Sequence, residues 1–148
     1  MPAPNNILVI NGPNLNLLGS RETSLYGHKG LDEIAKDVNG LANQHQVTLR
    51  WVQSNHEGQL IEYVHDALPD CAGIIINPAG YGHTSVALRD ALLAVNLPTV
   101  EIHLTNIAKR EDFRHRTLTA DVVVGQINGF GAYGYQLALL ALIRHLSR

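Results

Sequence analysis

Short apolar runs alternate with amphipathic segments along almost the whole chain. The apolar runs cover residues 7–11, 47–53, 72–77, 99–103 and 121–127, and most are rich in valine and isoleucine. Gly, Pro, Asn or Asp residues bound them, which is typical of short buried β-strands. We therefore predict five strands at these positions.

Helical periodicity fills the intervals between the apolar runs. Leu31, Ile34 and Val38 recur at helical spacing with charged residues on the opposite face. Similar patterns predict helices over residues 60–68, 85–95 and 134–146. Strands that alternate with helices form a parallel sheet covered on both faces. We expect the 148 residues to form one α/β domain with the doubly wound, flavodoxin-like strand order 2-1-3-4-5.

A long loop, residues 11–27, follows the first predicted strand. It contains Asn14, Asn16, Arg21 and Tyr26 and is punctuated by glycines. A loop of this length after a strand indicates a binding loop or a lid, although it could also be a plain connection.

Other polar residues follow the third and fourth predicted strands. Carboxyl ends of parallel strands share one edge of a sheet, and doubly wound proteins bind ligands there. The residues that we expect at this edge are Asn14, Arg21, Tyr26, Asn77, His83, Ser85, His103, Thr105, Arg110 and Arg114. Arginines with hydroxyl and amide groups favour a small anionic, polyhydroxylated ligand. Ser85 could help to bind an anion or could simply cap a helix.

Candidate acid–base groups lie in the same loops. His103 and His83 are the first candidates, and His56, which follows the second strand, competes with them. Glu101 precedes His103 by two residues and thus shares its side of the strand, where it could orient the imidazole. A buried structural role for His103 stays open. Tyr26 ionises too weakly to be a base at neutral pH unless a positive charge favours the phenolate.

Composition narrows the possible partners. Charged residues make up 16% of the chain, the net charge is −2 and there is no basic run, which argues against nucleic acid. Cys71 is the only cysteine, so an intrachain disulfide or a cysteine-cluster zinc site is excluded. We find no apolar run of membrane-spanning length and no signal-peptide pattern, and we expect a cytoplasmic protein.

Two further patterns have competing interpretations. Residues 129–134 read Gly-Phe-Gly-Ala-Tyr-Gly, which matches a dinucleotide-binding fingerprint. Because they follow the last strand and no acidic residue comes after them, close packing of the last helix on the sheet is favoured. A metal site made by His83, His103 and Glu101 is conceivable, but no ligand spacing requires it.

Several motifs in a fixed order carry a specific resemblance. They are Asn11-Gly-Pro-Asn-Leu-Asn-Leu-Leu-Gly, Arg21-Glu, Tyr26-Gly, Gln53-Ser-Asn-His-Glu-Gly, Asn77-Pro, His83-Thr-Ser-Val-Ala-Leu-Arg-Asp, Glu101-Ile-His and Arg110-Glu-Asp-Phe-Arg. Together they resemble the type II 3-dehydroquinate dehydratases over nearly the whole chain. Thr23 and Thr105 depart from the proline and serine that are usual in that family.

The resemblance implies a reaction and roles for particular residues. These enzymes eliminate water from 3-dehydroquinate through an enolate and give 3-dehydroshikimate, a step of the shikimate pathway of aromatic amino acid biosynthesis. By resemblance, Tyr26 as phenolate is the base, supported by Arg21. His103 is the general acid, oriented by Glu101, and Asn14 holds a water that stabilises the enolate.

The resemblance also implies how the substrate and the subunits are held. The substrate-binding residues would be Asn77, His83 and Arg114 at the ring hydroxyls, Leu104 (through its N–H) and Thr105 at the carboxylate, and Asp90 at a neighbouring subunit's site. It implies a dodecamer, a tetramer of trimers, with no metal or cofactor. The alternative from another class is a flavodoxin-like nucleotide- or flavin-binding module.

Overall fold

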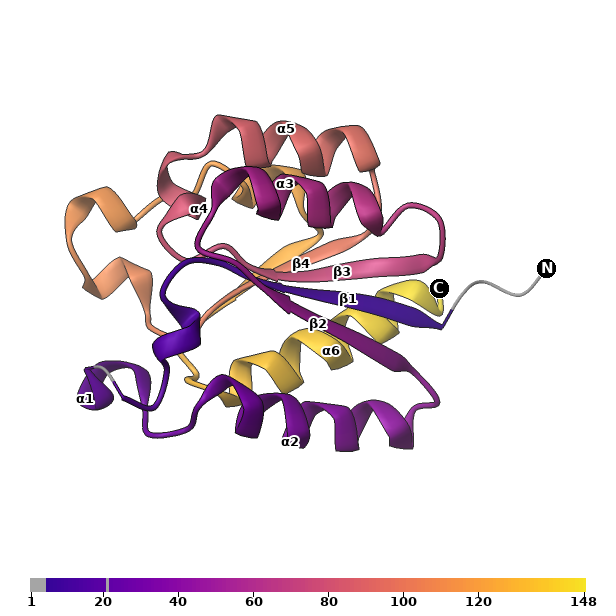
Figure 1. Cartoon of the computed structure of the whole chain (residues 1–148), viewed down its shortest axis with the longest axis horizontal. Coiled ribbons are helices and arrows are strands. Elements are labelled where there is room, and N and C mark those ends of the chain that lie inside the picture. Colours follow the sequence, from indigo (N-terminus) through magenta and orange to yellow (C-terminus); the bar gives the residue numbers. More distant parts are fainter. Residues whose placement is uncertain (1–4, 21) are drawn as a thin grey trace.

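A parallel sheet of five strands forms the centre of the protein (Figure 1). The computed structural model describes residues 5–20 and 22–148. Its strands are β1 (Asn6–Asn11), β2 (Thr48–Gln53), β3 (Cys71–Asn77), β4 (Thr99–His103) and β5 (Gly125–Asn128). They lie in the order β2-β1-β3-β4-β5, which confirms the predicted doubly wound topology.

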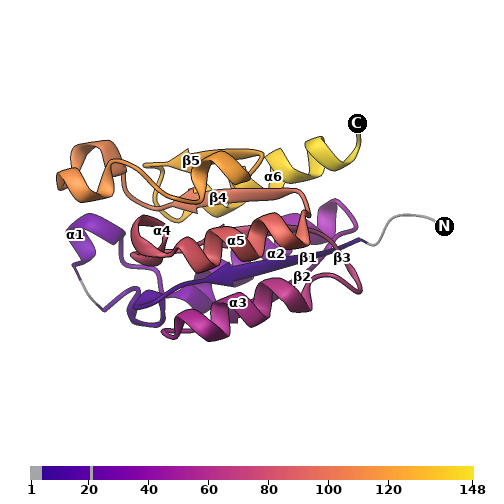
Figure 2. The ribbon, with the colours of Figure 1, turned by 90° about the horizontal axis from the view of Figure 1, so that it is seen from above.

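Two pairs of helices cover the two faces of the sheet. Helices α2 (Leu31–Gln44) and α6 (Tyr133–Leu146) pack on one face, and α3 (Glu57–Asp66) and α5 (Val86–Val95) pack on the other, as Figures 1 and 2 show. Along β1, Ile7 and Val9 face α2 and α6, whereas Leu8 and Ile10 face α3 and α5. Successive side chains of a strand point to opposite faces, so a sheet buried on both sides requires a continuous apolar run.

The last strand differs from the prediction. We expected it over residues 121–127, but Ala120–Val122 forms a 3-10 helix and β5 begins only at Gly125. Val122 and Val123 are half-buried against the core beneath α3 and α5, so packing of a loop explains their apolar character. Apolar runs of this length do not distinguish a strand from a buried loop.

Short helices occupy the loops at the carboxyl edge of the sheet, on the left of Figure 1. They are α1 (Thr23–Tyr26), α4 (Tyr81–Thr84) and 3-10 helices at Leu15–Leu17, Ile107–Lys109 and Asp112–Arg114. Among the described residues, no helix combines the length and apolarity needed to cross a membrane.

Two glycines allow segments to approach closely near this edge. A Cβ on Gly12 would lie 2.4 Å from the carbonyl oxygen of Pro78, because the loops after β1 and β3 are in direct contact. A Cβ on Gly134 would lie 3.1 Å from Ile102 Cδ1. The last glycine of the fingerprint-like motif therefore brings α6 close to the sheet, as we expected from its position.

Candidate active site

A small cavity opens where β1, β3 and β4 end. Its volume is about 130 Å³, and the loops after all three strands line it. The predicted site residues that line it are Asn14, Tyr26, Asn77, His83, His103, Leu104, Thr105, Arg110 and Arg114. The fold therefore brings together residues that are up to 100 positions apart in the sequence (from 14 to 114).

His103 and Glu101 form a buried pair beside this cavity. Their side chains are 6% and 0% exposed, and His103 Nε2 lies 2.7 Å from Glu101 Oε2. Since a carboxylate only accepts hydrogen bonds, Nε2 carries a proton and Nδ1 is the ring nitrogen that remains for a ligand. The expected orientation of the imidazole by Glu101 is present in the geometry.

Hydrogen bonds keep Glu101 ionised despite its burial. Burial alone raises the pKa of the Glu101 carboxyl, but hydrogen bonds from His103 and Thr119, together with the charge of His103, hold that pKa below its ordinary value.

His83 has a different setting from His103. Its Nδ1 lies 2.8 Å from the carbonyl oxygen of Arg116, so Nδ1–H donates and Nε2 of the neutral ring is an acceptor. Burial lowers the pKa of His83, and the positive charges of His103 and Arg114 act in the same direction. The two rings lie 5.9 Å apart between centroids. The Nε2 atom of a neutral His83 can therefore accept a hydrogen bond from a hydroxyl group of a ligand.

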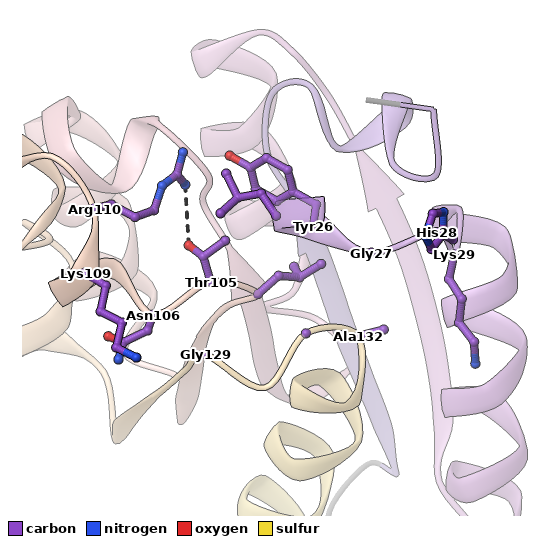
Figure 3. A pocket seen from close by; sticks show the side chains of 13 residues that line it. Tyr26, Gly27, His28, Lys29, Thr105, Asn106, Lys109, Arg110, Gly129 and Ala132 are labelled. Atoms are coloured by element: carbon purple, nitrogen blue, oxygen red, sulfur yellow. Dashed lines mark hydrogen bonds between the residues drawn. The ribbon is translucent and has the colours of Figure 1, made fainter. Parts of the chain in front are cut away.

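Tyr26 lines both this cavity and a second one. It ends α1 and is half-buried, and the Arg110 guanidinium lies over its ring at 5.3 Å from the centroid. The second cavity has a volume of about 370 Å³ and shares Tyr26, Leu104, Thr105 and Arg110 with the first (Figure 3). Figure 3 also shows the hydrogen bond from Arg110 to Thr105, at 3.4 Å.

Arg21, expected to support Tyr26, lies outside the described residues. Arg110 is a cation that the structure does place against Tyr26. The sequence located Arg110 at this edge but indicated no partner for it, because the two residues are distant in sequence and meet only through the fold.

Buried asparagine side chains form the base of the site. Asn77 Nδ2 donates to Tyr135 Oη at 3.1 Å, and Tyr135 Oη donates to Asn11 Oδ1 at 2.6 Å. Asn14 has a left-handed backbone (φ 70°), and its N–H donates to Asn55 Oδ1 at 2.9 Å. Neither Tyr135 nor Asn55 was predicted. Asn55 lies in a recognisable motif, but its contact with Asn14 has no local signal.

Some candidates do not line the cavity. Ser85 is buried and its Oγ accepts from Leu88 N–H at 2.9 Å, so the simpler interpretation as a helix cap is confirmed. His56 is exposed at the start of α3. Asp90 is exposed on α5, and Glu101 lies behind His103. Across residues 5–20 and 22–148, no group of three or more His, Cys, Asp or Glu side chains could hold a metal ion.

The fold and the site define a doubly wound α/β protein whose small polar cavity lies between a buried carboxylate–imidazole pair and a tyrosine. Residues 5–143 match the family described as dehydroquinase class II. The chain is 52% identical over 144 residues to the 3-dehydroquinate dehydratase of Halothermothrix orenii, covering 97% of each protein. It is 54% identical over 140 residues to that of Acaryochloris marina, covering 95% of this chain and 94% of the relative.

A solved structure agrees with these sequence relatives. The crystal structure of the type II dehydroquinase from Butyrivibrio crossotus superposes with a TM-score of 0.91 at 41% identity, covering 93% of this chain and 97% of that one. The chain therefore belongs to the class II dehydroquinase family.

Proposed function

We propose that this chain is a 3-dehydroquinate dehydratase that acts as a single catalytic domain. It eliminates water from 3-dehydroquinate and forms 3-dehydroshikimate, in the shikimate pathway. Near-full-length relatives with this name support the activity. The observation in the site that supports it best is that Tyr26 and His103, the latter paired with Glu101, line one cavity.

In the proposed mechanism, Tyr26 as phenolate removes the C2 proton of the substrate. The electron pair passes into an enolate, which Asn14 stabilises through a bound water. His103, which in this step must be an imidazolium with its second proton on Nδ1, then donates that proton to the departing C1 hydroxyl, which leaves as water. Anti elimination requires the base and the acid to act from opposite sides of the ring, and a cavity lined by both Tyr26 and His103 suits this.

The remaining lining residues suit the substrate's polar groups. We propose that Asn77, His83 and Arg114 bind the ring hydroxyls, and that the Leu104 N–H and Thr105 bind the carboxylate. Arg110 donates to the Thr105 hydroxyl, which places positive charge near the proposed carboxylate position. Because the Thr105 hydroxyl accepts the hydrogen bond from Arg110, it can still donate its own proton to the substrate carboxylate.

The segment that carries Tyr26 is proposed to close over the substrate, with Arg21 favouring the phenolate. The guanidinium of Arg110 lies over the Tyr26 ring, and this contact between the Tyr26 segment and the loop after β4 supports the proposed closure. Closure would also exclude water from the enolate.

We further propose that the protein assembles as a dodecamer, a tetramer of trimers, in which Asp90 contacts a neighbouring subunit's site. The exposed carboxylate of Asp90 on α5, near the exposed apolar side chains of Val86 and Leu93, supports this assignment. Analytical ultracentrifugation should give the mass of twelve chains. A monomer with full activity would exclude a contribution of Asp90 to a neighbouring site.

The activity is tested by following the enone absorbance of the product from 3-dehydroquinate in the presence of a chelator. Tyr26→Phe and His103→Ala should each abolish measurable turnover while ligand binding is retained. Tyr133→Phe is a matched control, since Tyr133 is exposed and lines neither cavity. A fully active Tyr26→Phe enzyme would refute the phenolate, and a greater loss in His83→Ala than in His103→Ala would reassign the acid.

A further inference from the structure

Glu101 contacts two side chains that have no role in the mechanism above. The Thr119 hydroxyl donates to Glu101 Oε1, and Gln126 Nε2 donates to Oε2, the oxygen that also accepts from His103. Gln126 Nε2 in turn donates to Thr117 Oγ1 at 3.1 Å. The carboxylate is therefore surrounded by donors from three separate segments.

We infer that Thr119 and Gln126 are positioning residues for the elimination, because they hold the Glu101 carboxylate in the one orientation that fixes the His103 imidazole. This inference rests on the proposed function, since it assigns these residues to the acid of that reaction.

The physical reason lies in the geometry of a buried carboxylate. Glu101 is fully buried and can accept all these hydrogen bonds only while it is ionised. Without the Thr119 hydroxyl, Oε1 would lose the hydrogen bond that Thr119 donates, and the carboxylate could rotate or take the proton from His103 Nε2. Either change would release the ring from the orientation in which Nε2 faces Glu101 and Nδ1 is left for the cavity.

The fold holds both donors firmly. Gln126 is the register partner of Glu101 across β4 and β5. Thr119 is fully buried in a loop, and both backbone polar groups of the preceding residue, Leu118, are hydrogen-bonded. Leu118 N–H donates to the Gly82 carbonyl at 2.7 Å, and Arg89 Nη1 donates to the Leu118 carbonyl at 2.8 Å. Arg89 also pairs with Asp121.

Thr119→Val tests the inference because it removes the hydroxyl and nearly conserves the shape. We expect kcat to fall about tenfold, a part of the 10²–10⁴ that a positioned acid contributes, with KM within about twofold of wild type. Thr119→Ser keeps a hydroxyl and should recover most of kcat. Thr99→Val is the matched control, because Thr99 is a buried threonine at the other end of β4 whose hydroxyl bonds only to the Leu97 carbonyl.

Gln126→Met provides a second variant at a half-buried position, and it should also lower kcat more than it changes KM. A substrate-free measurement separates this inference from the proposed function. In protein labelled with ¹⁵N-histidine, the His103 Nε2–H proton, assigned by its loss in His103→Ala, should resonate far downfield. It should move upfield or exchange away in Thr119→Val and stay unchanged in Thr99→Val.

Three results would overturn the inference. They are a Thr119→Val enzyme with wild-type kcat, a Thr119→Ser enzyme that loses as much kcat as Thr119→Val, and an unchanged His103 resonance in Thr119→Val. Absence of dehydratase activity in the wild-type protein would instead overturn the proposed function, while the resonance would still report on the positioning of His103.

Discussion

The Tyr135 hydroxyl is the central link of the buried polar network under the cavity, so its removal should be costly. It donates to Asn11 Oδ1 at 2.6 Å and accepts from Asn77 Nδ2 at 3.1 Å. Tyr135 and Asn11 are fully buried, so water does not readily replace the partner that Asn11 loses. Tyr135→Phe deletes one oxygen atom and leaves the ring in place.

The expected magnitude follows from the groups that lose a partner. Asn11 keeps its bond from Nδ2 to the Val52 carbonyl, and Asn77 keeps its bond from the Ala79 N–H to Oδ1. Each asparagine therefore loses one of its hydrogen bonds. A buried polar group left unsatisfied costs about 1–3 kcal/mol, and we expect a total loss of about 2 kcal/mol. For a chain of this size, that lowers Tm by about 4–8 °C.

The measurement is thermal unfolding at one fixed protein concentration, because assembly makes Tm depend on concentration. Tyr133→Phe is the control, since Tyr133 is on the same helix but is 55% exposed, and Tm should change by less than about 1 °C. Burial raises the pKa of Tyr135 well above its ordinary value, so the loss should be the same at pH 6 and pH 9. Because Asn77 is a proposed substrate ligand, KM should also rise. An unchanged Tm in Tyr135→Phe would refute the reasoning.

Two other predictions concern Glu101 and Gly12. Burial acts to raise the pKa of Glu101, but hydrogen bonds hold that pKa below its ordinary value. Its contribution to stability is therefore present above the ordinary pKa of a glutamate and is lost as the pH falls through the folded-state pKa. In Glu101→Gln, the fall of Tm on acidification below about pH 4.5 should be shallower than in wild type, and kcat at pH 7 should fall at least about a hundredfold. An equally steep fall of Tm would show that other carboxylates dominate. Gly12→Ala should lower Tm by an amount equivalent to about 1–3 kcal/mol and impair activity, because the Cβ would overlap the Pro78 carbonyl. Gly40→Ala, in α2 with no atom near the added Cβ, should instead raise Tm slightly, and equal losses in both variants would contradict the steric argument.

The central strands were predictable because burial on both faces requires an uninterrupted run of apolar residues, and such a run can be recognised in the sequence without knowledge of the fold. Ile74, Ile75 and Ile76 are consecutive, fully buried residues of β3. The edge strand β5 was predicted less accurately. None of its residues is fully buried, so its sequence carries a weaker pattern. Val122 and Val123 then extended the apolar run beyond the true strand.

The sequence could predict those site residues that lie at the carboxyl ends of neighbouring strands, because the strand order alone determines where they lie. Asn77 and His103 are the last residues of β3 and β4, Asn14 follows the end of β1, and strand adjacency alone brings them to one cavity. Contacts that come from elsewhere were missed. Thr119 reaches Glu101 from an irregular loop, and Tyr135 reaches Asn77 from the last helix. No periodic pattern marks a residue whose partner is fixed only by tertiary packing.

The proposed acid and base have opposite settings, and the contrast bears on how variants should behave. His103 lies in β4, an inner strand of the sheet. It is fixed by the Glu101 carboxylate, which itself accepts hydrogen bonds from Thr119 and Gln126. Tyr26 ends a four-residue helix, just before Gly27, whose φ of 91° few other residues adopt readily. Damage to the acid therefore requires changes inside the core, where stability is also affected. The base depends on loop geometry and on Arg110, so changes there should affect turnover while the fold is retained.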